Sequence, residues 1–569
     1  MKKGILFKTM SLIAGVILSA TSFAGTFEGT GKGFGGDIVL KAEITDNKLV
    51  AVEVVKEAES DFAKAAIKQI SDKAIASQSL DVDDIAGATG TSTGTKTALK
   101  NAIEKSGAVL TKVEAAKEEA KEISKETDIV IIGGGGAGIT AAIAAHEKGA
   151  RVILLEKTAL LGGNTNYATG GINAANTKIQ REAGIEDSAE LYMQDTMKGG
   201  RNVNNPELVK VLTENSAGII DWLVERGVDI TEVTFSGGQS VKRIHRPTGG
   251  VAVGPVVVGG LSKVLEKENI DVRTSERAVE IVKTGRRVTG VKVTGPNGDY
   301  EIKAKAVIVA TGGFGANPEM VEKYNPNLKG FGTTNSPAIL GEGIAMVEKV
   351  GGDLIDMKEI QTHPTVVHKK PYMITESVRG EGAILVNRDG QRFINELQTR
   401  DVVSKAVLEQ KEGSAFLLFN QEVREKLRAA DGYVKKGYAV EGTLAEVAQQ
   451  IGVDANTLKA TLEKYNEAVR TKNDPEFGKT AFARELLGDK FYAIEISPAI
   501  HHTMGGVRIN TNAEVLGKNG KAISGLYAAG EVTGGVHGAN RIGGNAVTDI
   551  TVFGKIAGEN AATFIKAVK

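Results

Sequence analysis

The pattern of apolar and polar residues changes most sharply at Thr127. From there, TDIVII is a short apolar run, GGGGAG a glycine turn, ITAAIAAHEKGA a helical stretch and RVILLE a second apolar run. Short apolar runs separated by a helix predict parallel strands that are buried on both faces of a sheet. A similar run at residues 304–310, and a C-terminal strand, glycine-rich loop and long helix, predict further parts of the same α/β domain.

The N-terminal region follows another pattern. Apolar and polar residues alternate from Thr26 to Val55 around a turn at Asp46–Asn47, which predicts antiparallel strands. Helices are expected at Ala63–Lys73 and Thr97–Ser106. Together these elements predict a small α+β domain ahead of the larger α/β domain.

Two segments flank this small domain. Residues 1–24 have a basic start, an apolar run and small residues at Ser22 and Ala24, which predict a cleaved signal peptide and export to a bacterial periplasm. A buried helix or a membrane anchor is the alternative, but the apolar run is short for a membrane span. Residues 113–126 (VEAAKEEAKEISKE) are charged and predict a solvated helical linker.

Composition narrows the chemistry. The chain of 569 residues has 70 basic and 70 acidic side chains, so no net basic field favours nucleic acid. It has no cysteine, which excludes disulfides, thiolate zinc sites, Cys-ligated iron–sulfur clusters and c-type haem attachment. Redox chemistry would therefore use a flavin, a nicotinamide or another organic cofactor, and no metal site is expected among the seven histidines.

The glycine turn predicts a dinucleotide site. Gly133, Gly135 and Gly138 form G-x-G-x-x-G between a strand and a helix, and Glu156 ends the next strand. The glycines let a pyrophosphate approach the helix N-terminus, and the acidic side chain can accept hydrogen bonds from ribose hydroxyls. FAD is favoured over NAD because GGNTNYATGGINAA, ATGG and GLYAAGE suit a ligand with contacts far apart in sequence.

These segments together resemble those of a known protein family. From Thr127 onwards the chain resembles the flavoprotein of the fumarate reductase and succinate dehydrogenase superfamily, especially soluble periplasmic fumarate reductases of the flavocytochrome c type. The motifs are GGGGAG, LLEK, GGNT, GGINAA, THPT, TESVRGEGAILVN, NELQTRD, HHTMGG and AAGEVTGGVHGANRIGGNA. No C-x-x-C-H haem motif is present, and GGNTNYATGG lacks the histidine that binds FAD covalently in membrane-bound relatives. The resemblance therefore implies non-covalent FAD.

The resemblance implies a Rossmann-like FAD-binding domain (127–358 and 500–569) with an inserted α+β clamp, or capping, domain (359–499). The small α+β domain (25–112) precedes them. The cofactor-binding residues that it implies are Gly133, Gly135, Gly136, Ala137, Gly138, Glu156, Lys157, Gly163, Asn164, Thr165, Gly170, Gly171, Ala278, Thr311, Gly312, Glu342, His502, Glu531, Arg541, Gly544, Ala546 and Val547. The substrate residues that it implies are His363, Met373, Thr375, Glu376, His501 and Arg541.

The resemblance also implies a mechanism. Flavin N5 passes hydride to one olefinic carbon of fumarate, while Arg541, His501 and His363 stabilise the charge that develops on the carboxylate. Arg400 protonates the second carbon, and Glu376 and Arg379 return a proton to Arg400. Without the resemblance, Glu376 and Arg379 would be interpreted as a surface ion pair spaced i,i+3.

The same residues bear on the substrate. Urocanate-reducing relatives resemble this family but carry tyrosine at the THP histidine, whereas this chain has His363. Fumarate is therefore the leading expectation, and urocanate, methacrylate, acrylate or cinnamate-type acids remain alternatives. A non-enzymatic flavin electron carrier or sensor is a third hypothesis, although a carrier has no use for Arg400, His501 and Arg541 together.

The threonine-rich stretch DDIAGATGTST completes the picture. Residues 25–112 resemble the FMN-binding domain of Na⁺-pumping quinone reductases, in which a threonine of the pattern D-x-x-[ST]-G-A-T carries FMN as a phosphoester. Thr89 would be the acceptor, and Ala86 departs from the pattern. A covalent FMN would take electrons from a periplasmic or membrane-anchored donor, and its attachment would require a flavin transferase. The alternative is a turn that caps the helix expected near Thr97.

Overall fold

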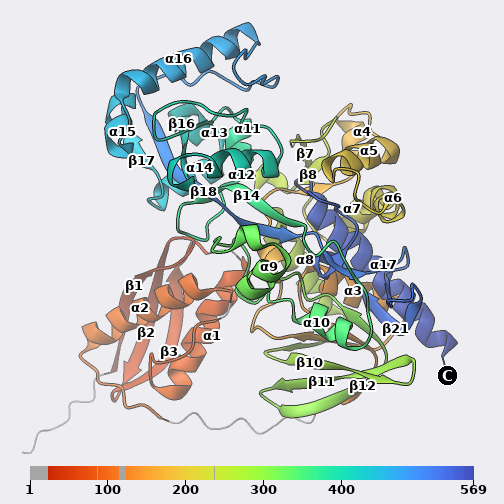
Figure 1. Cartoon of the computed structure of the whole chain (residues 1–569). Coiled ribbons are helices and arrows are strands. Elements are labelled where there is room, and N and C mark those ends of the chain that lie inside the picture. The colour runs from red at the N-terminus through yellow and green to blue at the C-terminus, as the bar shows by residue number, and fades with distance from the viewer. Residues whose placement is uncertain (1–23, 60, 86, 114–122, 236, 569) are drawn as a thin grey trace, which may run out of the picture. The chain divides into compact units, whose positions relative to one another are not determined.

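The computed structural model describes residues 24–59, 61–85, 87–113, 123–235 and 237–568. The chain divides into two compact units. The smaller is built from β1, β2, β3 and most of α1 and α2, and the larger contains the elements from β4 to α17 (Figure 1). Except for Ala24, the predicted signal peptide lies outside the described residues, as does most of the predicted linker.

The smaller unit is an antiparallel sheet with two helices: β1 (Ala24–Lys32), β2 (Asp37–Thr45), β3 (Lys48–Lys56), α1 (Asp61–Ser77) and α2 (Thr89–Ser106). Backbones touch where α2 crosses β1, since a Cβ at Gly29 would lie 1.9 Å from the Ala98 oxygen. The helix begins at Thr89 and not near Thr97, so that expectation was wrong. Glycine and threonine have weak helix propensity, but packing against the sheet overrides it here.

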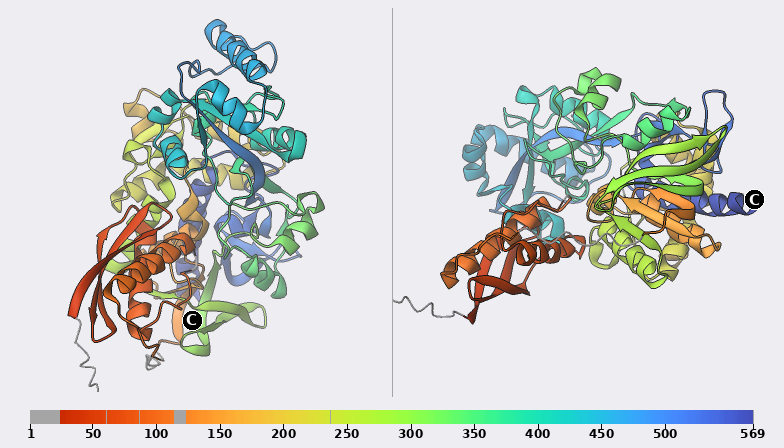
Figure 2. Two further views of the ribbon diagram at one scale, coloured as in Figure 1. Left: turned by 90° about the vertical axis from the view of Figure 1, so that its left-hand side faces the viewer. Right: turned by 90° about the horizontal axis from the view of Figure 1, so that it is seen from below.

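The larger unit contains an eight-stranded sheet with the order β10-β11-β21-β12-β4-β5-β9, and β20 pairs with β21. Neighbours from β21 to β9 run parallel, which confirms the predicted α/β architecture. β10, β11 and the first half of β12 form an antiparallel meander, drawn in green in the right-hand view of Figure 2. The strands are β4 (Glu126–Ile132), β5 (Val152–Glu156), β9 (Asp271–Thr274), β10 (Arg277–Thr284), β11 (Arg287–Gly295), β12 (Gly298–Val309), β20 (Glu514–Leu516) and β21 (Ala522–Ala528).

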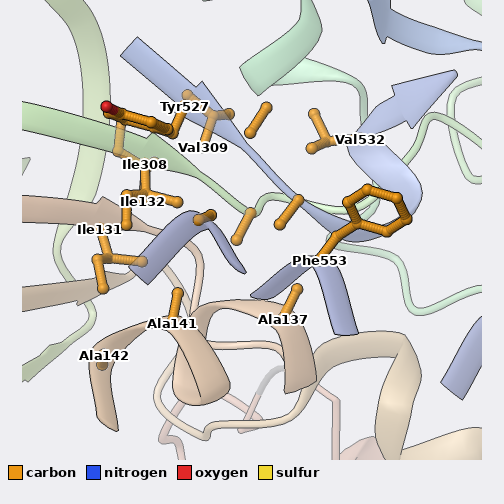
Figure 3. Packing of buried hydrophobic residues seen from close by; sticks show 14 of the residues in the cluster. Ile131, Ile132, Ala137, Ala141, Ala142, Ile308, Val309, Tyr527, Val532 and Phe553 are labelled. Carbon is orange, nitrogen blue, oxygen red and sulfur yellow. The ribbon is translucent and has the colours of Figure 1, made fainter. Parts of the chain in front are cut away.

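Two helices with small residues cover this sheet, α3 (Gly136–Glu147) and α17 (Asn545–Ala567). They approach so closely that a Cβ at Gly558 would lie 2.4 Å from the Ala141 oxygen. Figure 3 shows Ala137 and Ala141 of α3 beside Phe553 of α17, below the strand residues Ile132 and Val309. This packing sets the first turn of α3 at the carboxyl ends of the parallel strands.

A second hydrophobic core forms around a five-stranded sheet, which has the order β14-β18-β16-β15 with β17 beside β18. β18 joins the two cores, because Ile496 belongs to the second and Ile500 to the first. Its strands are β14 (Ile360–Val367), β15 (Ile384–Val386), β16 (Ala415–Asn420), β17 (Val440–Gly442) and β18 (Phe491–Thr503). Its helices are α11 (Ser377–Gly380), α12 (Arg400–Leu408), α13 (Gln421–Lys426), α14 (Arg428–Lys435), α15 (Leu444–Ile451) and α16 (Ala455–Thr471).

Shorter elements complete the larger unit. Two small sheets have the orders β6-β8-β7 and β13-β19-β22. Their strands are β6 (Ile172–Asn173), β7 (Glu232–Thr234), β8 (Ile244–Arg246), β13 (Leu354–Ile355), β19 (Gly506–Arg508) and β22 (Thr533–Gly534). The remaining helices are α4 (Lys178–Glu182), α5 (Ala189–Gly199), α6 (Pro206–Glu214), α7 (Ser216–Glu225), α8 (Val253–Lys267), α9 (Pro318–Tyr324) and α10 (Glu342–Lys349).

Candidate active site

A cavity of about 1090 Å³, open mouth included, lies at the carboxyl ends of β4, β5, β12 and β21. Ile132, Leu155, Ala310 and Ala529 mark those strand ends in its wall. Ligands of open parallel sheets bind outside the carboxyl ends of the strands. The cavity therefore lies where the glycine motif predicts a dinucleotide.

The three motif glycines meet different surroundings. Gly133 has φ +107°, and a Cβ there would lie 2.4 Å from the Ala310 oxygen. A Cβ at Gly138 would lie 1.8 Å from the Gly133 oxygen, so this glycine serves the contact between helix and strand. Gly135 differs, because the nearest protein atom, the Gly162 oxygen, is 3.8 Å away and the residue lines the cavity. The open space beside Gly135 suits a phosphate group.

The polar side chains that line the cavity also fit FAD. The hydroxyl of Thr311 is buried without a protein partner, although Thr311 lines the cavity. The Glu156 carboxylate accepts hydrogen bonds from the main-chain nitrogens of Gly134 (2.8 Å) and Thr158 (2.7 Å). Lys157 pairs with Glu342 across the cavity wall. The residues present therefore match a pyrophosphate beside the α3 N-terminus and a ribose beside Glu156.

The cavity brings together most of the expected cofactor residues. Its walls include Gly133, Gly135, Gly136, Ala137, Glu156, Lys157, Gly163, Asn164, Thr165, Ala278, Thr311, Gly312, Glu342 and Glu531. Those that lie elsewhere are Gly138, Gly170, Gly171, His502, Arg541, Gly544, Ala546 and Val547. Gly544 packs against Asn173, because a Cβ there would lie 2.4 Å from the Asn173 Oδ1.

Sequence reasoning missed one wall of the cavity, formed by Ser336, Ala338 and Ile339. Asn164 holds this wall in place, since its Oδ1 accepts from the Ser336 nitrogen (2.8 Å) and its Nδ2 donates to the Asn335 Oδ1 (2.6 Å). These partners are far apart in sequence and carry no motif, so no local pattern identified them.

A second group of polar side chains lies next to the cavity, and Glu531 connects the two. We call this group the Arg400 constellation; its members are Gln361, His363, Glu376, Arg379, Arg400, His501 and Arg541. The Glu531 carboxylate lines the cavity and accepts a hydrogen bond from the main-chain nitrogen of Thr503 (3.0 Å). Burial raises the pKa of Glu531. Thr503 directly follows His501 and His502 on β18, so the histidines lie next to the dinucleotide cavity.

Arg400 stands at the centre of this constellation as the first residue of α12. Its Nε donates to Glu376 Oε1 (2.6 Å), and its Nη1 donates to Gln361 Oε1 (2.9 Å). Arg379 Nη2 lies 3.8 Å from the same Glu376 oxygen. Burial would raise the pKa of Glu376, but Arg400 and Arg379 lower it to about 2, so the carboxylate is ionised at neutral pH.

Arg541 faces the same group from the loop before α17. Its Nη2 donates to Gln361 Oε1 (3.2 Å), and its Nη1 donates to the main-chain oxygen of Ile542 (3.1 Å). Its Nε is buried without a protein partner. Burial and Arg400 lower the pKa of Arg541 to about 9, so the guanidinium is still charged at neutral pH.

Gln361 holds the two arginines side by side, and sequence reasoning missed it. Its amide nitrogen donates to Asn540 Oδ1 (2.7 Å) and to the main-chain oxygen of Arg541 (2.8 Å), which turns its oxygen toward both guanidinium groups. The signal was its position two residues before His363, since residues i and i+2 of a strand share a face.

The histidines supply neutral donors. His363 is fully buried, and its Nδ1 accepts a hydrogen bond from the Thr365 nitrogen (3.3 Å), which leaves the proton on Nε2. That Nε2 has no protein partner. Its ring meets the His501 ring edge to face at 5.2 Å, and His501 Nδ1 lies 2.7 Å from the Thr334 hydroxyl. Burial and then Arg400 lower the pKa of both histidines well below the usual range.

The other expected residues take supporting places. Thr375 donates its main-chain N–H to the Tyr433 hydroxyl (3.0 Å), and Met373 forms a backbone bridge with Val366. His502 meets His537 at a ring separation of 5.3 Å, and burial followed by Arg541 lowers the pKa of His502. These contacts connect β18 and the clamp region to the Arg400 constellation.

Thr89, the expected FMN acceptor, is exposed and is the first residue of α2. Thr91 and Thr95 are buried, and the Thr91 hydroxyl donates to Glu59 (2.7 Å). Across the described ranges, no group of three or more His, Asp or Glu side chains could hold a metal ion. Nor does any helix in the described part of the chain have the length and apolar character of a membrane span.

Comparisons with known proteins match this architecture. An FAD binding domain family matches residues 128–547, and an FMN-binding domain family matches residues 33–104. The chain is 49% identical over 442 residues to the fumarate reductase (cytochrome) of Shewanella frigidimarina, covering 77% of each protein. It is 43% identical to the NADH:fumarate oxidoreductase of Klebsiella pneumoniae over 95% of this chain, but spans only 58% of that relative.

Two further comparisons bear on structure and substrate. The open conformation of a flavocytochrome c3 fumarate reductase superposes with a TM-score of 0.69 at 42% identity, covering 78% of this chain and 79% of that one. A urocanate reductase of Eggerthella lenta is 36% identical over 98% of this chain and 94% of its own length. The chain therefore belongs to the FAD-dependent fumarate reductase family and carries an FMN-binding domain ahead of its FAD-binding domain.

Proposed function

We propose that this protein reduces the carbon–carbon double bond of fumarate to give succinate. One observation carries the proposal: Arg400 shares the carboxylate of Glu376 with Arg379 and the amide of Gln361 with Arg541. These hydrogen bonds and ion pairs support Arg400 as proton donor, Glu376 and Arg379 as its return path and Arg541 as the anion-binding guanidinium, beside the dinucleotide cavity.

The substrate dianion binds through groups that lack protein partners. Arg541 offers its Nε to one carboxylate, and His363 offers its Nε2 proton to the other. Both side chains are buried, so the bonds form away from competing water. When bound, FAD supplies a hydride to one olefinic carbon, and Arg541 and the neutral histidines stabilise the charge that develops on the adjacent carboxylate.

Arg400 gives a proton to the second carbon, so that one hydride and one proton complete the reduction. A guanidinium is a weak acid, but the nascent carbanion is a strong base and Arg400 is held in place by two hydrogen bonds. Glu376, ionised with a pKa of about 2, then passes a proton from the Arg379 side to Arg400.

In this proposal Thr89 would hold FMN as a phosphoester, and FMN bound there would supply the entry point for electrons. Thr89 is exposed at the start of α2, whereas Thr91 and Thr95 are buried and hydrogen-bonded. A flavin transferase would attach the FMN, and a periplasmic or membrane-anchored donor would supply the electrons. Export by the segment 1–24 belongs to the same proposal.

A reductase of another unsaturated acid is the second candidate, and the urocanate reductase of Eggerthella lenta favours it. The buried His363 favours a carboxylate at its end of the site. An assay with a reduced dye and either fumarate, urocanate, acrylate or methacrylate separates these candidates. Fumarate should give the highest kcat/KM. A higher value with urocanate would mean that urocanate and not fumarate is the substrate. No turnover with any of these acids would favour the hypothesis of a non-enzymatic electron carrier.

Flavin fluorescence in a denaturing gel tests the FMN attachment. Protein co-expressed with a flavin transferase should fluoresce, and Thr89→Ala should not. Thr93→Ala is the matched control, because Thr93 is also exposed on α2. Fluorescence retained by Thr89→Ala would place the FMN elsewhere.

A further inference from the structure

Four charged side chains that the proposed mechanism does not use form a buried cluster in the clamp region. Arg392, Glu396, Asp474 and Lys479 are all buried, and Glu396 is fully so. Two cations and two anions make the cluster neutral. Buried charges persist when they are paired and hydrogen-bonded, and both conditions hold here.

Glu396 is the centre of this buried cluster. Its Oε1 accepts from Arg392 Nε (2.8 Å), and its Oε2 accepts from Arg392 Nη2 (3.2 Å) and Lys479 Nζ (3.1 Å). Arg392 also donates from Nη2 to Asp474 Oδ2 (3.0 Å). The carboxylate is therefore fixed by two cations, which come from segments on either side of α16.

Aromatic rings hold the cations in turn. The Arg392 guanidinium lies 4.9 Å from the Phe477 ring centre and 5.2 Å from that of Tyr465, and the Lys479 ammonium lies 5.1 Å from the same Tyr465 ring. Tyr465 belongs to α16, the long helix at the outer end of this region in Figure 1. The cluster thus ties the segment that carries Glu396 to the outer helix.

The backbone of Glu396 reaches the proton path. Its main-chain oxygen accepts a hydrogen bond from Arg379 Nη1 at 2.6 Å. Arg379 is 3% exposed, its Nε has no protein partner, and its Nη2 is 3.8 Å from Glu376. The bond to Glu396 is therefore the shortest contact that orients this guanidinium toward Glu376.

We propose that Glu396 is a positioning residue for proton delivery: the buried cluster fixes its backbone, and that backbone aims Arg379 at Glu376. The inference rests on the proposed function and extends it to a residue that does not touch the substrate. Burial lowers the pKa of Arg379, and the carboxylates of Glu376 and, to a smaller extent, Glu396 oppose that shift.

The test uses the full-length, FAD-loaded protein and two variants. Glu396→Gln removes the negative charge but leaves an uncompensated cation buried, so it can fail to fold. The double variant Glu396→Gln/Lys479→Met keeps the remaining charges balanced as Arg392 and Asp474. The double variant should melt near the native temperature, with kcat for fumarate lowered about tenfold, KM within about twofold and an increased solvent isotope effect on kcat.

A matched control removes a different ion pair from the same region. Arg388 and Glu495 contact each other at 2.5 Å, and no contact joins either to Arg379. Arg388→Met/Glu495→Gln should leave kcat and the solvent isotope effect unchanged. An isotope effect that rises equally in the control would mean that general loosening of the clamp region explains the result, and would overturn the role of Glu396.

A double-mutant cycle with Arg379→Lys gives the sharpest outcome. If Glu396 acts through Arg379, adding Glu396→Gln/Lys479→Met to Arg379→Lys should lower kcat by less than about twofold further, because the group that it positions is already lost. A full additional tenfold loss would overturn the inference. A native protein that reduces no unsaturated acid would overturn the proposed function as well, whereas an active native protein with an unaffected double variant would overturn the role of Glu396 alone.

Discussion

The dinucleotide cavity and the Arg400 constellation are adjacent but are built by different means. The cavity depends on backbone, because Gly133 and Gly138 let a helix start against a strand where any Cβ would clash. The constellation depends on side chains from separate segments, because Arg400 and Arg541 meet at the Gln361 oxygen and Arg400 also bonds Glu376. Substitutions at the backbone site should therefore lower the stability of the fold or the affinity for FAD, whereas substitutions at the side-chain site should lower the rate of turnover.

The largest expected effect falls on the side-chain site. Arg400→Ala should lower kcat for fumarate by about a thousandfold or more, within the range of a lost general acid, while FAD stays bound. Arg400→Lys keeps the positive charge but loses the two hydrogen bonds that fix the guanidinium, so its kcat should lie between those of the native protein and Arg400→Ala. Steady-state kinetics and the flavin spectrum measure both properties. Turnover retained by Arg400→Ala would contradict its role as acid.

The backbone site should respond in the opposite way. Gly138→Ala places a Cβ 1.8 Å from the Gly133 oxygen, so the larger unit should lose about 2 kcal/mol or more of its free energy of unfolding. Gly135→Ala meets no protein atom within 3.8 Å, so stability without FAD should change by less than about 0.5 kcal/mol. Its FAD affinity should still fall about tenfold, because the methyl group occupies the space proposed for the phosphate.

Thermal melts and FAD titrations distinguish the two glycines. Equal destabilisation of both variants without FAD would contradict the division between a packing glycine and a phosphate-facing glycine. A native FAD affinity in Gly135→Ala would place the phosphate elsewhere in the cavity.

The contrast also explains what the sequence could predict. A backbone site leaves a local record: G-x-G-x-x-G lies between a strand and a helix, so the parallel sheet and the cavity position followed from spacing. Side-chain sites leave no local record, and Arg400 entered through family resemblance. Gln361 and the cavity wall at Ser336 could not be predicted, since their roles depend on partners far along the chain. The start of α2 at Thr89 was not predicted because packing overrides the weak helix propensity of its first residues.

The dependence of stability on pH should come from the side-chain site, which holds buried titratable groups. The pKa values of His363, His501 and His502 are lowered mainly by burial, so the unfolded chain binds more protons near pH 6 than the folded chain. Their contribution to stability is present above pH of about 6.5 and is lost as pH falls, by up to about 1.4 kcal/mol per pH unit for each histidine. The contribution of Glu376, with a pKa of about 2, is lost only below the ordinary carboxyl pKa of 4.5.

Unfolding at a series of pH values measures these windows. His363→Gln should flatten the slope between about pH 6.5 and 5, where an unfolded histidine gains its proton. His146→Gln is the control, because His146 lies outside the Arg400 constellation, near the end of α3. An unchanged slope in His363→Gln would mean that this histidine is protonated in the folded protein.

The smallest expected effect lies at the rim of the dinucleotide cavity. Glu342 pairs with Lys157 and Arg277, but its side chain is 24% exposed and that of Arg277 is 55% exposed. Ion pairs at such sites contribute about 1 kcal/mol or less because water screens them. Glu342→Gln should therefore change FAD affinity by less than about fivefold and leave kcat unchanged, and high salt should reduce even that difference. A loss as large as that of Gly135→Ala would show that side-chain charge, and not backbone shape, dominates cofactor binding.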